Sequence, residues 1–373
     1  MRILFTGGGT GGHFFPIVAV IRELKKLAEE EKILDLELYY VGPDDFGEKF
    51  LKEEGVICLK IESGKWRNYS SPANFLDLLK TAWAVATGLW KVFLIMPDVV
   101  FSKGGYGALP AVVGAMTFRI PTLIHESDAI PGKVNAFSAG FAKRIGIAFA
   151  GAEEFFPKDR TALVGIPIRK RILGGNLAEA KEDLDVFSSL PVVGFLGASQ
   201  GAQKINETLL GILKELTEEF EIVHQTGPKN FNEIKGEASV VLEFAYKERY
   251  HPYGFLDEVK MREFYLVSDL VVSRAGASSI FEIAAWGKPA ILIPLRNSAQ
   301  DHQRKNAYEY ARTGATIVIE EENLKPHVLR AEIKKVLGSP ELMKKMGEAA
   351  QRFSRIDSAE TIAREILKLG ITH

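Results

Sequence analysis

A buried strand followed directly by a glycine-rich loop and a helix occurs twice in this chain of 373 residues, and the repetition limits the possible folds. Arg2–Thr6 leads into GGGTGGH (7–13), and Val192–Leu196 leads into GASQG (197–201). Short apolar runs that alternate with helical stretches are typical of parallel α/β units. We therefore predict an α/β protein with two similar, Rossmann-like domains in tandem.

The same pattern predicts the other strands and the domain boundary. Proline, glycine and charged residues cluster over Phe156–Arg169, which we interpret as the linker. It separates an N-terminal domain (1–160) from a C-terminal domain (161–354), and the last helix, within 355–373, is expected to return to the first domain. Further strands are predicted at Leu36–Val41, Asp98–Ser102, Thr122–His125, Arg144–Ala148, Phe220–Gln225, Leu270–Ser273 and Ala290–Pro294.

Charge and composition exclude several classes of protein. The 47 basic residues nearly balance the 48 acidic ones, which argues against a general nucleic-acid-binding protein. Cys58 is the single cysteine, so no disulfide can form within the chain. The longest apolar run, Ala82 to Met96, is interrupted by Lys91 and is too short for a membrane span. We expect a protein that is soluble or rests on a membrane surface.

The first glycine loop is the strongest local indication of a ligand site, because glycines admit a ligand close to the backbone and the helix start offers free N–H groups. His13 closes this loop, as a packed histidine or as a general base that takes a proton near neutral pH. Gly7, Gly9 and Gly12 also satisfy the dinucleotide pattern G-x-G-x-x-G. A nicotinamide enzyme needs an acidic residue at the end of the second strand, which here is YVGP (40–43), so we disfavour that class.

Two further glycine loops follow strands. FSKGGYG (101–107) forms either a tight turn or a phosphate cradle, and GASQG opens the second domain. Because the three loops follow strand ends in two domains, we expect a ligand in a cleft between the domains.

Two other segments of the second half carry polar groups after strands. In RAGASSIFE (274–282), Glu282 is either a solvated side chain or an acceptor for two ribose hydroxyls. The segment Pro294 to Asn306 mixes amide, imidazole and cationic groups. Asp183-x-Asp185 lies in a helical stretch, not at a strand end, and the seven histidines lack metal-ligand spacing, so we predict no metal site.

In order along the chain, these segments resemble the motifs of the bacterial peptidoglycan transferases that convert lipid I to lipid II (the MurG-type N-acetylglucosaminyltransferases). The resemblance covers nearly the whole chain. It rests on GGGTGGH with Pro16, GGY (104–106) with Pro110, His125-Glu126, Gly165-x-Pro167-x-Arg169, GASQG, Phe255-Leu256-Asp257, Arg274 to Glu282, His302-Gln303 and Asn306-Ala307.

The resemblance implies the glycosyltransferase-B fold, with two Rossmann-like domains facing across a cleft and the nucleotide mainly on the second. It implies UDP-N-acetylglucosamine as donor, an undecaprenyl-diphosphate-linked muramoyl peptide as acceptor, no cofactor, and a peripheral position on the anionic cytoplasmic face of the cell membrane. Diacylglycerol is the alternative acceptor, and a sugar-nucleotide-binding regulator without turnover is the rival from another class.

The resemblance also assigns roles to single residues. His13 matches the proposed base, and Glu126 is the alternative candidate. The donor or its sugar is approached by Thr10, Gly11, Gly12, Asp128, His302 and Gln303, the donor diphosphate by Arg169 and Ser199, and the uracil by Leu256. The donor-binding helix start is Ala277, Ser278, Ser279, Ile280 and Phe281, with Glu282 on the ribose, and the acceptor diphosphate is assigned to Gly104, Gly105 and Tyr106.

One departure from the family pattern concerns the sugar contacts. The family usually has His-Glu-Gln-Asn where this chain has His125-Glu126-Ser127-Asp128. A carboxylate accepts from a sugar hydroxyl but lacks the donors of the amide. Ala198 in place of a usual glycine and Ala108 in place of a common serine should both leave phosphate binding intact.

The segment Phe75 to Phe93 is apolar nearly all round its expected helix. Such a helix is either buried between others or rests partly on an anionic bilayer. Trp83 and Trp90 suit the depth of a membrane interface, and Lys65, Arg67, Lys80 and Lys91 flank the segment.

Overall fold

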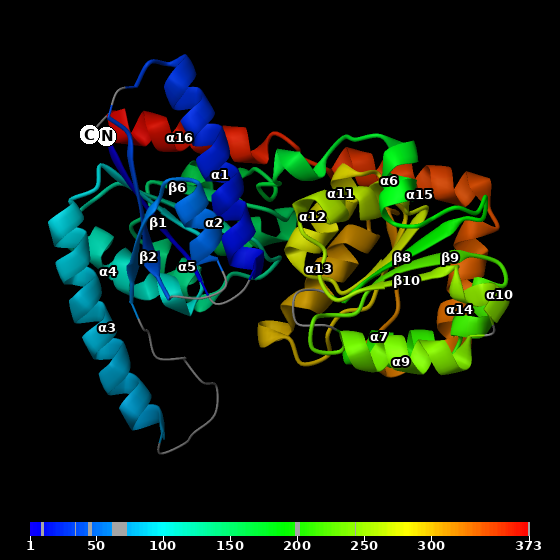
Figure 1. Ribbon diagram of the computed structural model, residues 1–373. Helices are drawn as coiled ribbons and strands as arrows, with labels where there is room; N and C mark the ends of the chain where they lie inside the picture. Colours follow the sequence, from blue (N-terminus) through cyan, green and yellow to red (C-terminus); the bar gives the residue numbers. More distant parts are fainter. Residues whose placement is uncertain are drawn as a thin grey trace. The chain divides into compact units, whose positions relative to one another are not determined.

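The computed structural model describes residues 1–8, 11–33, 35–43, 47–61, 73–197, 202–242 and 244–371. Within these ranges side chains are described except at residues 11, 13, 73–80, 244 and 245. The chain forms two compact units (Figure 1). Unit 1 is Met1–Arg169 with Arg355–His373, and unit 2 is Lys170–Ser354.

The elements of unit 1 alternate between strands and helices. In chain order they are β1 (Arg2–Thr6), α1 (Gly11–Glu30), β2 (Glu37–Gly42), α2 (Glu48–Glu53), β3 (Ile57–Lys60), α3 (Ala73–Ile95), β4 (Val99–Ser102), the short 3-10 helix η1 (Tyr106–Ala108), α4 (Leu109–Thr117), β5 (Thr122–Glu126), α5 (Lys133–Ser138), β6 (Arg144–Ile147), η2 (Ala150–Phe155), η3 (Lys158–Arg160), β7 (Thr161–Leu163) and the C-terminal α16 (Ser358–Ile371).

Across the described part of unit 1, the strands form one parallel sheet in the order β3-β2-β1-β4-β5-β6-β7. The order reverses between β1 and β4, where the crossovers leave in opposite directions. Thr6 pairs with Ser102 in this register, so both strands end at the same level. Loops that follow them meet at one edge of the sheet, the position where open α/β sheets bind ligands.

Alternate residues of β1 point to opposite faces of this sheet. Ile3 and Phe5 pack in one core with α1 and with Ile362 and Ile366 of α16. Leu4 packs in a second core with α3 and α4. The C-terminal helix therefore completes the apolar cover of α1 and belongs to unit 1.

The elements of unit 2 follow the same alternation. They are η4 (Lys170–Ile172), α6 (Leu177–Asp183), β8 (Val192–Leu196), α7 (Gln203–Leu210), α8 (Leu213–Thr217), β9 (Glu221–Gln225), α9 (Phe231–Val241), α10 (Phe244–Lys247), β10 (Tyr250–Tyr253), α11 (Glu258–Val267), β11 (Leu270–Ser273), α12 (Ala277–Ala285), β12 (Ala290–Leu292), η5 (Ala299–Asp301), α13 (His302–Ala311), β13 (Thr316–Val318), η6 (Glu321–Asn323), α14 (Pro326–Leu337) and α15 (Pro340–Phe353).

Its sheet is also parallel, in the order β10-β9-β8-β11-β12-β13 among the residues described. The order reverses between β8 and β11, so the second unit repeats the topology of the first. Gly194 of β8 lies against α11, because a Cβ there would come within 2.4 Å of the Phe264 ring and the Ser268 hydroxyl. The prediction of two Rossmann-like α/β domains with parallel sheets is confirmed.

Four strands were not anticipated: β3, β7, β10 and β13. They are the two edge strands of each sheet, and several of their residues are exposed or half-buried. An edge strand covers less core, and β10 (YHPY) accordingly lacks a continuous apolar run. β3 and β13 carry short apolar runs, VICL (56–59) and TIVI (316–319), which were overlooked. β7 lies within 156–169, where the sequence predicts only a linker. The predicted domain boundary after residue 160 falls directly before β7, and β7 belongs to unit 1, which continues to Arg169.

Candidate functional site

In unit 1 the loops after β1 and β4 lie side by side at the reversal point of the sheet. The Lys103 backbone N–H donates to the Thr6 carbonyl at 2.8 Å. A Cβ on Gly7 would come within 3.0 Å of both the Lys103 Cβ and the Ile17 Cδ1. Gly7 is therefore required for the close approach of these two loops and α1.

The second loop turns through two left-handed residues, Gly104 (φ 75°) and Gly105 (φ 80°). Only glycine adopts this geometry without strain. Gly104 also lies against Asn135 of α5, because an added Cβ would come within 2.7 Å of that amide. Tyr106 follows, half-buried, at the start of η1.

The loop after β5 is organised by a buried carboxylate. Glu126 is 4% exposed and accepts hydrogen bonds from the backbone N–H groups of Asp128 and Gly132, both at 3.0 Å, and from the Asn135 amide at 2.9 Å. Burial and the nearby Asp128 charge raise the pKa of Glu126, while these hydrogen bonds act in the opposite direction. The carboxylate thus holds the loop that carries Asp128, which is itself half-buried.

The Arg169 side chain packs against α1, the first helix of unit 1. Its guanidinium carbon stacks 4.0 Å from the centre of the Phe15 ring, and the side chain is 7% exposed. Phe15 follows His13 by two residues in the first turns of α1. Arg169 therefore brings a permanent positive charge to the N-terminal end of α1.

In unit 2, α12 begins directly after β11, beside the reversal point. Its N-cap residue Gly276 is extended and provides no side-chain hydrogen bond to the helix start. Ala277 and Ile280 are buried, whereas Ser278 and Ser279 are half-buried. An open helix start of this kind presents backbone N–H groups and a partial positive charge, which suits an anionic ligand.

Two further regions of unit 2 carry candidate residues, and one of them is hydrogen-bonded to the loop before α12. Leu256, 2% exposed, lies just before α11, and Asp257 caps that helix through the N–H groups of Val259 (3.0 Å) and Lys260 (2.9 Å). After β12, Asn306 of α13 donates to the Ala275 carbonyl at 3.4 Å. This bond ties helix α13 to the loop that precedes α12.

The polar side chains in the first turn of α13 make hydrogen bonds to the segment between β12 and this helix. The Gln303 side-chain oxygen accepts from the Leu295 N–H at 3.0 Å, and the His302 Nδ1 donates to the Ala299 carbonyl at 2.6 Å. Gln300 and Asp301 have left-handed backbone angles (φ 54° and 57°), which turns the loop sharply into α13. The His302 and Gln303 side chains are half-buried, and their hydrogen bonds hold the preceding loop to the start of α13.

Several candidate groups cannot be placed. Thr10 and Ser199 lie outside the described residues, as do the side chains of Gly11 and His13, although the backbone of His13 belongs to the first turn of α1. Gly12, in the same turn, is exposed. Phe281 is buried in α12, and Glu282 is half-buried one residue further on. In the ranges where side chains are described, no group of three or more His, Cys, Asp or Glu could hold a metal ion.

Two residues of these sites were missed. Lys103 was quoted only as part of the second glycine loop, and Tyr265 was not singled out. Lys103 is 1% exposed at the end of β4, and the Tyr265 hydroxyl lies 3.2 Å from Glu282. The adjacency of Lys103 to two glycines was the available signal, whereas nothing in the local sequence pointed to Tyr265.

Comparisons with known proteins agree with this architecture. Residues 3–147 match the glycosyltransferase family 28 N-terminal domain and residues 192–362 the family 28 C-terminal domain. In fold, the chain is similar to the crystal structure of Acinetobacter baumannii MurG (TM-score 0.74, 24% identity, 98% of this chain and 99% of that chain). It is also similar to the UDP-GlcNAc 2-epimerase of Neisseria meningitidis (TM-score 0.68, 14% identity, 99% and 100%). The two Rossmann-like units and these matches define a glycosyltransferase of the glycosyltransferase-B fold.

Sequence relatives narrow the family. The chain is 34% identical to the UDP-N-acetylglucosamine–N-acetylmuramyl-(pentapeptide) pyrophosphoryl-undecaprenol N-acetylglucosamine transferase of Thermodesulfovibrio yellowstonii, over 97% of both chains. It is 36% identical to the protein of the same name from Geobacter metallireducens, over 98% of both. The chain belongs to this family of N-acetylglucosamine transferases within glycosyltransferase family 28.

Proposed function

We propose that this protein transfers N-acetylglucosamine from UDP-N-acetylglucosamine to O4 of the N-acetylmuramoyl group of lipid I, which forms lipid II in peptidoglycan synthesis. The observation that carries the proposal is the full-length similarity to transferases of that name, with the motifs at the sheet reversal points of both units. No feature of the chain favours diacylglycerol as the acceptor over the muramoyl lipid.

The donor site that we propose lies on unit 2. The uncapped start of α12 suits the UDP diphosphate, since its N–H groups and dipole favour negative charge. Glu282, on the second turn, would accept the ribose hydroxyls, and Leu256 would contact the uracil. His302 and Gln303 would contact the sugar from the first turn of α13, a helix that Asn306 ties to the loop before α12.

The chemistry that we propose is a single displacement. The acceptor O4 attacks the anomeric carbon as the bond from that carbon to the UDP oxygen breaks, so the α-linkage is inverted to β. His13 takes the O4 proton, and Arg169, Ser199 and the α12 dipole stabilise the charge that develops on the departing UDP. Thr10, Gly11, Gly12 and Asp128 would lie near the transferred sugar, and the Gly104–Tyr106 loop would bind the acceptor diphosphate.

We also propose that unit 1 meets the membrane through α3. The inner side of α3 packs tightly on α4, because a Cβ on Gly88 would come within 2.6 Å of Pro110. Its outer side exposes Trp83 (76%), Trp90 (61%) and Leu94 (61%). No helix in the described ranges is long and apolar enough to cross a bilayer. An exposed stripe with two tryptophans suits the interfacial depth of an anionic membrane, at its cytoplasmic face.

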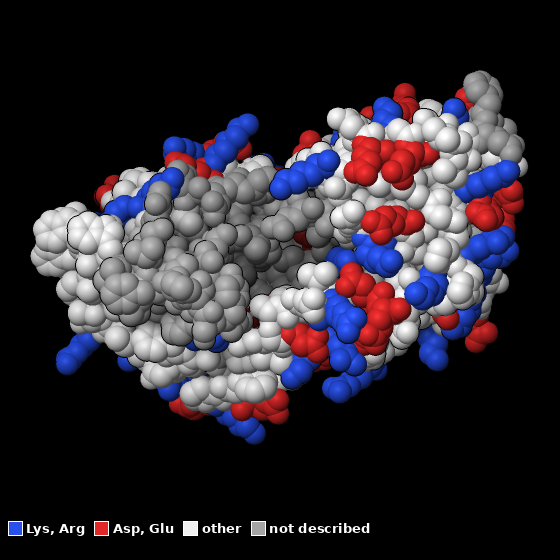
Figure 2. All heavy atoms as spheres, turned by 90° about the horizontal axis from the view of Figure 1, so that it is seen from below, with Lys and Arg blue, Asp and Glu red and all other residues white. Residues whose placement is uncertain are grey.

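Charge supports these partners over nucleic acid. Figure 2 shows acidic and basic side chains interspersed over unit 2 on the face in view, and the formal net charge is −1. Nucleic acids bind proteins through patches of positive charge, since phosphate contacts dominate their affinity.

The test is product analysis by mass spectrometry after incubation with UDP-N-acetylglucosamine and either a lipid I analogue or diacylglycerol. We expect a product larger than the lipid I analogue by one N-acetylhexosamine, and none from diacylglycerol. Turnover of diacylglycerol alone would replace the acceptor in the proposal, and donor binding without any product would favour a regulator.

A further inference from the structure

Lys103 is a buried lysine at the junction of the two glycine loops of unit 1. It is the first residue after β4 and directly precedes Gly104, and its side chain is 1% exposed. Its Cβ lies beside Gly7, and its backbone N–H is bonded to the Thr6 carbonyl. Lysine is almost never fully buried unless its ammonium is paired, so this position needs an explanation.

The direct partners of this ammonium are two neutral groups on β5 and the turn that follows. The Lys103 Nζ lies 2.7 Å from the His125 Nδ1 and donates a hydrogen bond to the Ser127 hydroxyl. Because an ammonium has no acceptor, His125 accepts at Nδ1 and donates from Nε2 to the Gly165 carbonyl at 2.7 Å. Burial, and then the Lys103 charge, hold the pKa of His125 well below its usual range, so the imidazole stays neutral.

The negative charge that balances Lys103 comes from Glu126 and Asp128, which alternate in sequence with His125 and Ser127. Burial lowers the pKa of Lys103 to about 8, and the charges of Glu126 and Asp128 act against this lowering. Glu126 is already the acceptor of three donors within its own loop. Two neutral groups lie nearby: Gly7 beside the Lys103 Cβ, and Asn135 against the adjacent Gly104. The charges of Glu126 and then Asp128 both favour the Lys103 ammonium, and Asp128 directly follows Ser127, which Lys103 contacts.

We infer that Lys103 is a positioning residue that holds the Ser127–Asp128 turn against the Gly104–Tyr106 loop, and that Lys103 and Asp128 form a charge pair. The pair explains why this chain tolerates a carboxylate where the family usually has asparagine: the carboxylate is matched by a buried cation. The inference rests on the proposed function, because it assumes that these two segments bind the sugar and the acceptor.

The charge pair predicts that the two residues must change together. Lys103→Met has a similar length and no charge, so it removes the hydrogen bonds and leaves Asp128 without its cation. Asp128→Asn leaves the buried ammonium with less balancing charge. In Lys103→Met/Asp128→Asn neither charge remains, and the turn packs on an apolar side chain.

The experiment is a double-mutant cycle on kcat, on KM for each substrate, and on the melting temperature. We expect each single variant to lose about 10–100-fold in kcat/KM, since small misplacements near reacting groups have effects of this size. The double variant should lose at least tenfold less than the product of the single losses, as coupled neighbours do. The matched control is the exposed Lys143, directly before β6, and Lys143→Met with Asp128→Asn should combine without coupling.

A second readout separates positioning from simple packing. The wild-type turnover should fall above about pH 8, where Lys103 loses its proton, and this alkaline loss should be absent in the double variant. Losses that multiply in the cycle, or single variants that melt earlier but turn over normally when folded, overturn the inference. If Lys103→Met does not fold, Lys103→Gln takes its place, and failure of both double variants to fold also overturns the pair.

The proposed function is tested separately by the wild-type protein. A wild-type protein that forms no product contradicts the function, and the melting temperatures of the wild type, the two single variants and the double variant still test the charge pair. Normal wild-type turnover with an uncoupled cycle contradicts the charge pair alone.

Discussion

The Tyr265 hydroxyl donates a hydrogen bond to the Oε2 of Glu282 at 3.2 Å. Tyr265 is fully buried on α11, and its ring stacks on Trp286, with the ring centres 6.3 Å apart. The Trp286 indole N–H in turn donates to the Ile172 carbonyl at 3.0 Å. The carboxylate that we assign to the ribose is therefore oriented by groups anchored in the core of unit 2.

The first prediction concerns Glu282 itself. Glu282→Ala should weaken binding of UDP-N-acetylglucosamine by about 1.5–3 kcal/mol, the range for hydrogen bonds that involve a charged group. Calorimetric titration with the donor measures this, and Glu237→Ala on the exposed side of α9 is the matched control. An affinity equal to that of the control would remove Glu282 from the ribose.

The second prediction concerns the residue that orients Glu282. Tyr265→Phe removes one hydroxyl and keeps the ring stacking, so donor binding should weaken by about 0.5–1.5 kcal/mol, less than in Glu282→Ala. The effect should vanish when Glu282 is already alanine. A loss of the same size in that background would show that Tyr265 acts through packing and not through the carboxylate.

The third prediction tests the general base. His13→Ala should lower turnover by roughly 10²–10⁴-fold, because a positioned base contributes in this range, while donor affinity changes little. Steady-state kinetics with donor titration measures both quantities. Turnover within a few-fold of wild type would leave His13 a structural role, and Glu126→Gln would be the next variant to assay.

The fourth prediction concerns the membrane surface. Trp83→Glu with Trp90→Glu should reduce binding to vesicles that contain anionic lipid and reduce turnover of a long-chain acceptor. Turnover of a short, water-soluble acceptor and the melting temperature should stay near normal, since both side chains are largely exposed. Val240→Glu, at an 86% exposed valine of unit 2, is the control. Equal loss on both acceptors would place the membrane surface elsewhere.

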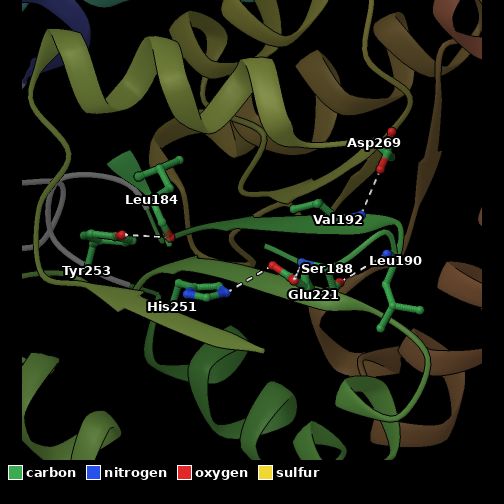
Figure 3. A network of polar contacts seen from close by, with 8 residues as sticks. All are labelled: Leu184, Ser188, Leu190, Val192, Glu221, His251, Tyr253 and Asp269. Carbon is green, nitrogen blue, oxygen red and sulfur yellow. Dashed lines mark hydrogen bonds and ion pairs between the residues drawn. The ribbon is translucent and has the colours of Figure 1, made fainter. Parts of the chain in front are cut away.

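The fifth prediction uses the polar network of unit 2 in Figure 3. Glu221, 1% exposed, accepts from the Ser188 N–H at 2.7 Å and from the His251 Nε2 at 3.2 Å. Burial raises the pKa of Glu221, but these hydrogen bonds outweigh burial and leave the pKa below its usual value. A lowered folded pKa adds stability above the unfolded pKa of about 4.3 and loses it as the pH falls through the folded pKa.

Glu221→Gln should therefore lower the free energy of unfolding by about 1–3 kcal/mol at pH 7, and the difference from wild type should shrink below about pH 4. Urea unfolding at both pH values measures it. Glu219→Gln, which loses an exposed ion pair with Lys334, should change stability by less than about 1 kcal/mol. A difference for Glu221→Gln that is independent of pH would contradict the role of its charge.

The sequence by itself determined the central strands, the two glycine-loop units and the places where the site loops emerge. Each of these depends on local chemistry: a continuous apolar run for a strand buried on both faces, and glycine where the backbone turns at positive φ, as at Gly104 and Gly105. The order of the motifs along the chain was also enough to indicate the family. Among the edge strands, β10 was missed because its sequence, YHPY, has no apolar run, whereas β3 and β13 carry short apolar runs that were overlooked.

Only the tertiary structure decided which polar side chains meet. Lys103 contacts His125 and Ser127, and Tyr265 contacts Glu282, across separations that no local period encodes. The contacts of Lys103 form because parallel strands bring their carboxyl ends to one edge of the sheet, and because the register of β1, β4 and β5 sets the level at which each strand ends. Tyr265 meets Glu282 because the fold places helices α11 and α12 side by side at that point. A buried charge is stable only with partners that the fold supplies from elsewhere in the chain.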